Sequence, residues 1–139
     1  MEKIAVIGGG AAGMMVSIFA ARRGMEVHVY EKNEKTGKKL YITGKGRCNL
    51  TNACDMEELL ESVKSNKKFL YSAFYGFTNQ DAYDFFEAEG LKLKVERGNR
   101  VFPMSDRSAD VLDTLRRAMK SAGVQVHLNA EVKSVRKQE

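Results

Sequence analysis

The pattern of apolar and polar positions at the start of the chain predicts a strand, a tight turn, a helix and a second strand. Ile4 to Ile7 form an apolar run, and Met14 to Arg22 continue as a helix with apolar positions on most of its faces. Gly24 ends this helix, and Glu26 to Tyr30 then alternate as a second strand. The order predicts an α/β protein built on a parallel sheet.

The rest of the pattern predicts further elements. Helices are expected over Asp55 to Ser65, with Asp55 as cap, over Gln80 to Glu89, capped by Thr78 or Asn79, and over Ala109 to Ala122, capped by Ser105 or Ser108. Strands are expected over Leu91 to Glu96, paired in a hairpin with Arg100 to Phe102, over Val124 to Leu128 as a third parallel strand, and over Glu131 to Arg136. No repeat, low-complexity segment or linker divides the chain.

The turn after the first strand carries three spaced glycines in the pattern G-x-G-x-x-G. Gly8 allows a tight bend, Gly10 lets the backbone approach a pyrophosphate, and Gly13 lets the helix pack closely on the strand. The N–H groups at the start of that helix, including those of Ala11 and Ala12, face the phosphates together with the positive end of the helix dipole. The pattern predicts dinucleotide binding.

A carboxylate follows the second strand at the position expected for the ribose of the dinucleotide. Glu31 lies roughly 20 residues after the glycines, where the fingerprint places the acceptor for the ribose hydroxyls. Its charge disfavours the 2'-phosphate of NADP. These residues do not decide between FAD and NAD.

Composition narrows the class of protein. The 139 residues are 43% hydrophobic, enough for one modest core but short for a complete flavoenzyme or dehydrogenase. The net charge of +5 suits a polyanionic cofactor as well as RNA. Cys48 and Cys54 form neither a disulfide framework nor a C-x-x-C pair, and His28 and His127 are expected to face the surface from strands, so no metal site is predicted.

No signal peptide precedes the first strand, and no apolar run reaches the length of a membrane span. A soluble, cytoplasmic protein with no membrane partner is therefore expected. The abrupt end of the parallel sheet indicates that later strands lie outside these residues.

The segment from Lys32 to Arg47 is rich in glycine and carries six basic residues. It is either a solvated basic connection or a clamp in which N–H groups and cations converge on an anionic ligand. The spacing of a Walker loop is absent.

The stretch GKKLYITGKGRCNLTN, Gly37 to Asn52, closely resembles the YhiN/BaiN-type family of FAD-dependent flavoproteins, which includes aminoacetone oxidases. The N-terminal GGGAAG, the strand ending in YEK and RVFPMSDRSADVLDTL, Arg100 to Leu115, add to this resemblance. It covers most of the chain and favours FAD over NAD. It implies a Rossmann-like FAD-binding domain with a doubly wound parallel sheet, of which residues 1–139 are the N-terminal portion, without the later strands and the substrate domain.

The resemblance also implies cofactor neighbours beyond the glycine turn. Residues after the second strand would pass under the flavin and pyrophosphate, and the backbone near Val132 would bind the adenine. The implied neighbours are Lys32, Lys39, Thr43, Gly44, Lys45, Gly46, Arg47, Cys48 and Asn49. Cys48 is either a thiol of lowered pKa beside Arg47 or a small buried residue in a tight turn.

Few other side chains suggest chemistry. The aromatic residues of Phe69 to Phe77, including Tyr71, Phe74 and Tyr75, have helical spacing and are expected in the core rather than against flavin or substrate. Arg100 and Arg107 could bind an acidic substrate, although surface roles fit either one alone. No catalytic acid or base is identified.

The sequence therefore predicts the N-terminal FAD-binding part of a flavin-dependent oxidoreductase acting on a small molecule. One alternative is an NAD-binding module of a dehydrogenase. Another is a non-catalytic nucleotide- or RNA-binding protein that uses the lysine-rich loop; the sequence shows no aromatic stacking platform for this role, so no nucleic-acid partner is expected. The substrate and the oligomeric state are left open.

Overall fold

The structure is a computed structural model that describes residues 1–139, which form two compact units. The first unit consists of Met1–Tyr41 and Leu115–Glu139, and the second of Ile42–Thr114. The second unit is thus inserted in the sequence of the first. No helix is long and apolar enough to cross a membrane.

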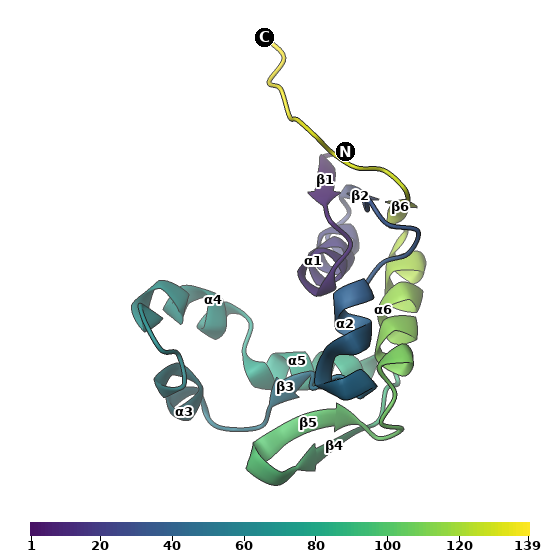
Figure 1. The fold of residues 1–139 in the computed structure, drawn as a ribbon. Helices are drawn as coiled ribbons and strands as arrows, with labels where there is room; N and C mark the ends of the chain where they lie inside the picture. The colour runs from purple at the N-terminus through teal and green to yellow at the C-terminus, as the bar shows by residue number, and fades with distance from the viewer. The chain divides into compact units, whose positions relative to one another are not determined.

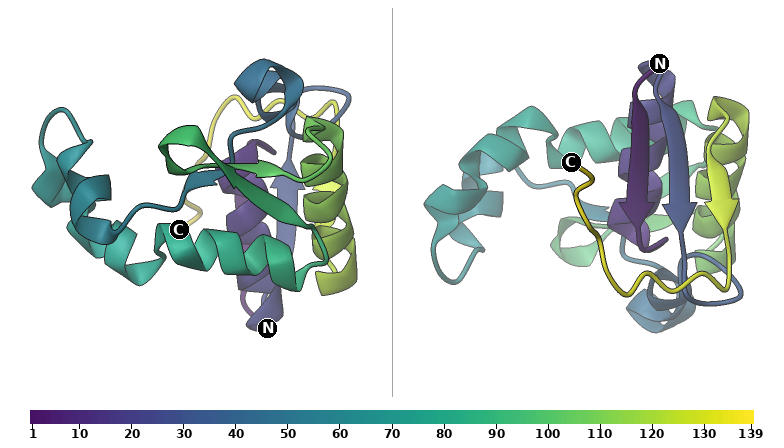
Figure 2. Two further views of the ribbon diagram at one scale, coloured as in Figure 1. Left: turned by 90° about the horizontal axis from the view of Figure 1, so that it is seen from below. Right: turned by 90° about the horizontal axis from the view of Figure 1, so that it is seen from above.

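The first unit is built on a three-stranded parallel sheet (Figures 1 and 2). Strand β1 (Lys3–Ile7) pairs with β2 (Glu26–Tyr30), and β2 pairs with β6 (Gln125–His127). Helix α1 (Ala11–Arg22) connects the first two strands, as the sequence predicts. The predicted third parallel strand beside the second is also confirmed.

One face of this sheet carries the core of the first unit. The side chains of Val27 and Val29 in β2 are buried, as are Met14 and Ile18 of α1. The right-hand view of Figure 2 shows the strands in front of the helices. Burial of each such side chain contributes about 1.5 to 3 kcal/mol, so these contacts hold α1 against the sheet.

Helix α6 (Ser108–Ala122) begins one residue before the predicted range and ends, as predicted, before Gly123, whose φ of 84° is in the left-handed region. Its predicted apolar face is buried: Val111 and Leu112 lie in the second unit, and Leu115 and Met119 in the first.

The expected strand over Glu131 to Arg136 is wrong. These residues are exposed and pair with no strand. After β6 the chain turns toward the segment that follows β2, where Asn129 N–H donates to Asn33 O and Ala130 N–H to Glu31 O. Alternation assigns residues to two faces, but a strand forms only where the segment pairs with another strand, and this segment pairs with none.

The second unit contains a small antiparallel sheet in the order β3-β5-β4. The predicted hairpin is confirmed: β4 (Leu93–Glu96) and β5 (Arg100–Pro103) pair across the short 3-10 turn η3 (Arg97–Asn99). Strand β3 (Thr51–Asn52) pairs with β5, and sequence analysis missed it because two residues carry no periodicity.

Two helices of the second unit start at the predicted caps. Asp55 accepts a hydrogen bond from Glu58 N–H at the start of α3 (Met56–Glu61), which is shorter than expected. Thr78 and Asp81 form a reciprocal capping box at the start of α5 (Asn79–Ala88). A cap of this kind contributes about 1 kcal/mol. Between these helices lie the 3-10 turn η2 (Lys67–Leu70) and the short helix α4 (Tyr71–Gly76).

Candidate functional site

The glycine turn has the geometry that its sequence predicts. Gly8 has a φ of 97°, and its N–H donates to Tyr30 O at 2.9 Å, which fixes the turn to the end of β2. A Cβ atom at Gly13 would lie 1.9 Å from the carbonyl oxygen of Gly8, so only glycine lets α1 begin this close to the turn.

The start of α1 is open to an anion. Gly10 is the N-cap, with φ −83° and ψ −168°, and provides no side-chain cap. A Cβ atom at Gly10 would meet nothing within 4 Å, and the first turn contains no acidic residue. The N–H groups of a helix start therefore remain available beside empty space, as a pyrophosphate requires. Ala11 and Ala12 stand at this start, as predicted.

The carboxylate of Glu31 binds the glycine turn directly. Its Oε1 accepts from Gly9 N–H at 3.0 Å and its Oε2 from Asn33 N–H at 2.6 Å, while the residue is only 7% exposed. An ionised carboxylate has about four acceptor positions, so these bonds leave capacity for ribose hydroxyls. The predicted ribose contact is untested and stays a prediction, but Glu31 also has a structural role that the sequence did not reveal.

Gly9 is the residue that sequence analysis left without a role. Gly37 N–H donates to Gly9 O at 2.8 Å, opposite the bond from Gly9 to Glu31. A Cβ atom at Gly9 would lie 2.8 Å from Thr36 Cγ2, and Thr36 is itself buried. The middle glycine of the GGG run was the available signal: it leaves room for the segment that follows β2.

Three other predicted cofactor residues belong to the first unit. Lys32 is exposed just after Glu31, and Lys39 is exposed on the short helix α2 (Lys38–Ile42). Val132 is 36% exposed and follows Ala130, whose N–H binds Glu31 O. The chain segments that carry Lys32 and Val132 are therefore joined at the carboxyl end of the sheet. Their contacts with a cofactor stay predictions.

The remaining predicted cofactor residues, Thr43 to Asn49, form a tight turn in the second unit. The 3-10 turn η1 (Thr43–Gly46) contains Gly44 and Lys45 at φ 57°, and Gly46 and Cys48 follow at φ 83° and 60°. The Asn49 amide lies 3.1 and 3.2 Å from the carbonyl oxygens of Thr51 and Val101, within donating distance of its NH2 group. The flavin contacts of this turn stay predictions.

Arg47 is held in a cluster of four charges. Its Nε is 2.8 Å from Asp106 Oδ1, a second guanidinium nitrogen binds both Asp106 and Glu96, and the guanidinium lies 4.0 Å from the centre of the Phe102 ring. Lys94 binds the same two carboxylates. Hydrogen bonds from Arg47 and Lys94 lower the pKa of Glu96 and of Asp106. Arg47 thus orders the second unit.

Cys48 is a small buried residue in a tight turn, and the lowered-pKa alternative is wrong. It is 3% exposed, and burial raises its pKa more than the Thr43 hydrogen bond lowers it. Arg47 is adjacent in sequence, but its charge is engaged by carboxylates. A buried thiol of raised pKa is a poor nucleophile.

The expectation that the aromatic stripe of Phe69 to Phe77 is core is also wrong. Phe69 is 79% exposed, Tyr75 63% and Tyr71 40%, and Tyr71 and Tyr75 contact each other edge to face at 6.4 Å. Helical spacing shows that such residues share a face but does not show what covers that face.

The two histidines are not simply surface-facing. His28 Nδ1 and His127 Nε2 lie 2.9 Å apart, the rings stack at 5.2 Å, and both residues are half-buried. The chain has no group of three His, Cys, Asp or Glu side chains that could hold a metal ion. Arg100 and Arg107 are exposed; Arg100 Nε donates to Arg97 O.

The parallel sheet, the glycine turn and the acid at the end of β2 define a dinucleotide-binding protein of the Rossmann type. Comparison with known proteins makes this specific: the chain belongs to the HI0933-like protein Rossmann domain family, which matches residues 2–139. The predicted YhiN/BaiN-type family and the Rossmann-like fold are confirmed, and both support FAD as the cofactor.

Two curated relatives match nearly the whole chain. A 3-dehydro-bile acid delta(4,6)-reductase of Clostridium scindens is 33% identical over 138 residues, which is 98% of this chain and 33% of that protein. A ribosomal RNA dihydrouridine synthase of Escherichia coli is 32% identical over 134 residues, 96% of this chain and 33% of that protein. The chain therefore spans about a third of the length of these relatives.

Solved structures share the fold at low sequence identity. A 3-ketosteroid-delta4-(5alpha)-dehydrogenase from Rhodococcus jostii superposes with a TM-score of 0.65 at 16% identity, covering 92% of this chain and 38% of that one. A flavocytochrome c3 fumarate reductase superposes with a TM-score of 0.58 at 23% identity, covering 92% of this chain and 27% of that one.

Proposed function

We propose that residues 1–139 are the N-terminal FAD-binding portion of a flavin-dependent oxidoreductase that acts on a small molecule. The observation that carries this proposal is the open helix start at Gly10, beside a turn that Gly13 and Glu31 hold in place. Family membership favours FAD over NAD, and the reductase name of the Clostridium relative supports a small organic substrate.

In this proposal each residue has a limited task. The N–H groups at the start of α1 bind the pyrophosphate, the free acceptor positions of Glu31 bind the ribose, and the backbone near Val132 binds the adenine. The turn of Thr43 to Asn49 adjoins the flavin. When bound, the flavin supplies hydride or electron transfer, and the protein positions it and sets its potential. Both cysteines are free thiols, which suits the reducing cytoplasm that we propose as its location.

The test is a comparison of FAD and NAD binding by the complete protein after its cofactor has been removed. We expect FAD to restore a visible flavin spectrum with a defined stoichiometry and NAD to compete poorly. Selective binding of NAD would instead support the dehydrogenase alternative.

A second candidate substrate is RNA, and one observation favours it. The strip formed by Phe69, Tyr71 and Tyr75 is exposed, and the exposed or half-buried Lys64, Lys67 and Lys68 precede it in sequence. A single-strand binding surface combines aromatic faces with cations. Lys64 and Lys68 are the cations here that form no ion pair, since Lys67 is paired with Glu61. The Escherichia coli relative is named for an RNA substrate. The exposure of this strip is what supports a stacking role in the RNA alternative.

The two candidates differ in what Phe69→Ala does to the complete protein. If RNA is the substrate, this variant weakens binding of a single-stranded RNA by about 1 to 3 kcal/mol, the usual contribution of one stacked base. Val95→Ala, which removes an apolar group that is 50% exposed outside the strip, is the matched control. RNA affinity that is equal in both variants and the wild type would exclude this RNA surface and leave the small molecule as the remaining candidate substrate.

A further inference from the structure

The first unit contains a groove with an apolar floor and a basic rim, and none of its lining residues is among the predicted cofactor residues. The groove has a volume of about 400 Å³ and lies between α6, β6 and the loop that follows β2. Met119, Val126 and Leu128 contribute to the floor, and Lys35, Arg116 and Lys120 carry the positive charges. Its volume falls within the range of about 300 to 1,000 Å³ that is typical of small-molecule sites.

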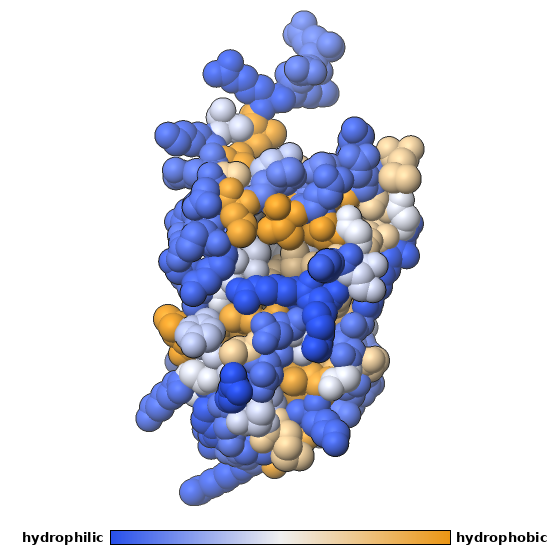
Figure 3. Space-filling model, turned by 90° about the vertical axis from the view of Figure 1, so that its right-hand side faces the viewer, coloured by the Kyte–Doolittle hydropathy of each residue, from blue (hydrophilic) through white to orange (hydrophobic).

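The apolar floor is accessible to a ligand. Val126 in the edge strand β6 is 40% exposed, and Leu128, just after this strand, is 42% exposed. Met119 of α6, which also lines the groove, is buried. Figure 3 views the side on which α6 lies and shows apolar patches in its upper half next to strongly hydrophilic side chains. Covering these side chains with an apolar group would be favourable by about 25 cal/mol per Å² of area removed from water.

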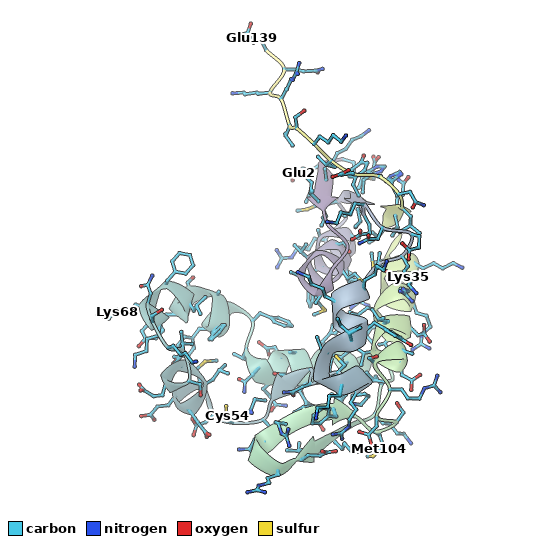
Figure 4. All side chains as sticks on the ribbon, in the orientation of Figure 1. Glu2, Lys35, Cys54, Lys68, Met104 and Glu139 are labelled. Atoms are coloured by element: carbon cyan, nitrogen blue, oxygen red, sulfur yellow. The ribbon has the colours of Figure 1, made fainter.

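The rim carries charge of one sign. All ionisable lining residues are basic, and neither Lys35 nor Lys120 forms an ion pair. Lys35 extends beside α6 (Figure 4), with its Nζ 6.0 Å from the centre of the Tyr41 ring. An anionic group in the groove would therefore meet two cations that are not ion-paired, of which Lys35 also acts electrostatically on the neighbouring Glu34 carboxylate.

Arg116 is positioned in advance for the same task. Its Nε donates to Thr36 Oγ1 at 3.1 Å and a terminal nitrogen donates to Thr36 O at 2.7 Å, which fixes the guanidinium against the loop. Two carbonyl oxygens at the end of α6 already accept hydrogen bonds: Gly123 N–H donates to Lys120 O, and Val124 N–H donates to Met119 O. These bonds partly offset the negative end of the helix dipole, which therefore repels an anion in the groove less.

We propose that this groove binds an amphipathic organic anion, with the apolar body on Met119, Val126 and Leu128 and the anionic head among Lys35, Arg116 and Lys120. The ligand class is a small monoanion, such as a medium-chain carboxylate. The inference does not depend on the cofactor, because it uses only charge complementarity and the apolar floor of the groove.

The probe is decanoate, titrated into the complete protein by calorimetry below its micelle concentration, with 1-decanol as the uncharged counterpart. We expect saturable binding of one decanoate and weaker binding of 1-decanol. The double variant Lys35→Gln/Lys120→Gln should lower decanoate affinity about tenfold through loss of two charge-assisted contacts. The matched control Lys92→Gln/Lys137→Gln removes the same charge from exposed positions outside the groove and should bind as the wild type does.

Val126→Glu places a like charge on the floor and should abolish decanoate binding. Thermal unfolding of each variant shows that it is folded, and flavin content in the same samples reports the cofactor site separately. Absence of saturable binding, or binding that the double variant leaves unchanged, would overturn the proposal. So would a structure of the complete protein in which another polypeptide segment fills the groove.

Discussion

Gly10→Ala should separate cofactor binding from folding. Gly10 has φ −83°, which any residue can adopt, and its added Cβ would meet no atom within 4 Å. Replacing glycine by alanine stabilises a compatible site by about 0.4 to 1 kcal/mol through the unfolded chain. Alanine is a poorer N-cap than glycine by a similar amount, so the two effects nearly cancel. The free energy of unfolding should change by less than about 1 kcal/mol.

Cofactor binding should respond very differently. The methyl group would occupy the space in which the backbone must approach the pyrophosphate. We expect FAD affinity to fall at least about tenfold, which corresponds to about 1.4 kcal/mol. The assay is titration of the cofactor-free complete protein with FAD, followed by quenching of flavin fluorescence, alongside thermal unfolding of the same cofactor-free samples.

Two further substitutions make the result interpretable. Gly76→Ala in α4 also adds a methyl group with nothing within 4 Å. It should leave FAD affinity unchanged and stabilise the fold by about 0.4 to 1 kcal/mol, because no N-cap is lost there. Gly13→Ala forces its methyl group onto Gly8 O, so this variant should lose both FAD affinity and stability. A Gly10→Ala protein with wild-type FAD affinity would refute the placement of the pyrophosphate at this turn.

Three other predictions follow from the contacts described above. Glu31→Gln should weaken both FAD binding and folding by about 1.5 to 3 kcal/mol each, because an amide has one oxygen and cannot accept from both the Gly9 and Asn33 N–H groups. FAD titration and urea unfolding measure the two effects, and if neither changed, Glu31 would have neither role. Stability should fall in acid below the ordinary pKa values of Glu96 and Asp106, 4.5 and 3.8, because a lowered folded-state pKa adds stability that is lost as pH falls through it. Asp106→Asn should make the urea midpoint depend less on pH, and an unaltered pH dependence would contradict a stabilising role of the charge cluster. Iodoacetamide should label Cys54 before Cys48 in the folded protein, because Cys48 is buried, and mass spectrometry that finds the reverse order would contradict its burial.

Local sequence signals predicted those parts of the fold that depend on neighbours in the chain. The glycine turn, the caps at Asp55 and Thr78 and the hairpin around Gly98 all follow from residues close together in sequence. The parallel pairing of β6 with β2 was also predictable, because the order of strands and helices restricts the topology.

Long-range contacts were not predictable in the same way. The hydrogen bond between Gly9 and Glu31 spans 22 residues and that between Arg47 and Asp106 spans 59. The fingerprint contains Gly9 and Glu31 but does not predict that they bond to each other, and no motif links Arg47 to Asp106. The exposed aromatic strip and the absent strand after β6 share another cause: a periodic pattern assigns residues to a face but cannot show whether a partner covers that face.

The central claim is that this chain holds FAD at the glycine turn, and its most direct test is a visible absorbance spectrum before and after desalting. The spectrum is recorded on the purified 139-residue chain and on the complete protein, with and without added FAD. We predict flavin bands that stay with the complete protein through desalting. A complete protein that is colourless and also fails to take up added FAD would contradict the account.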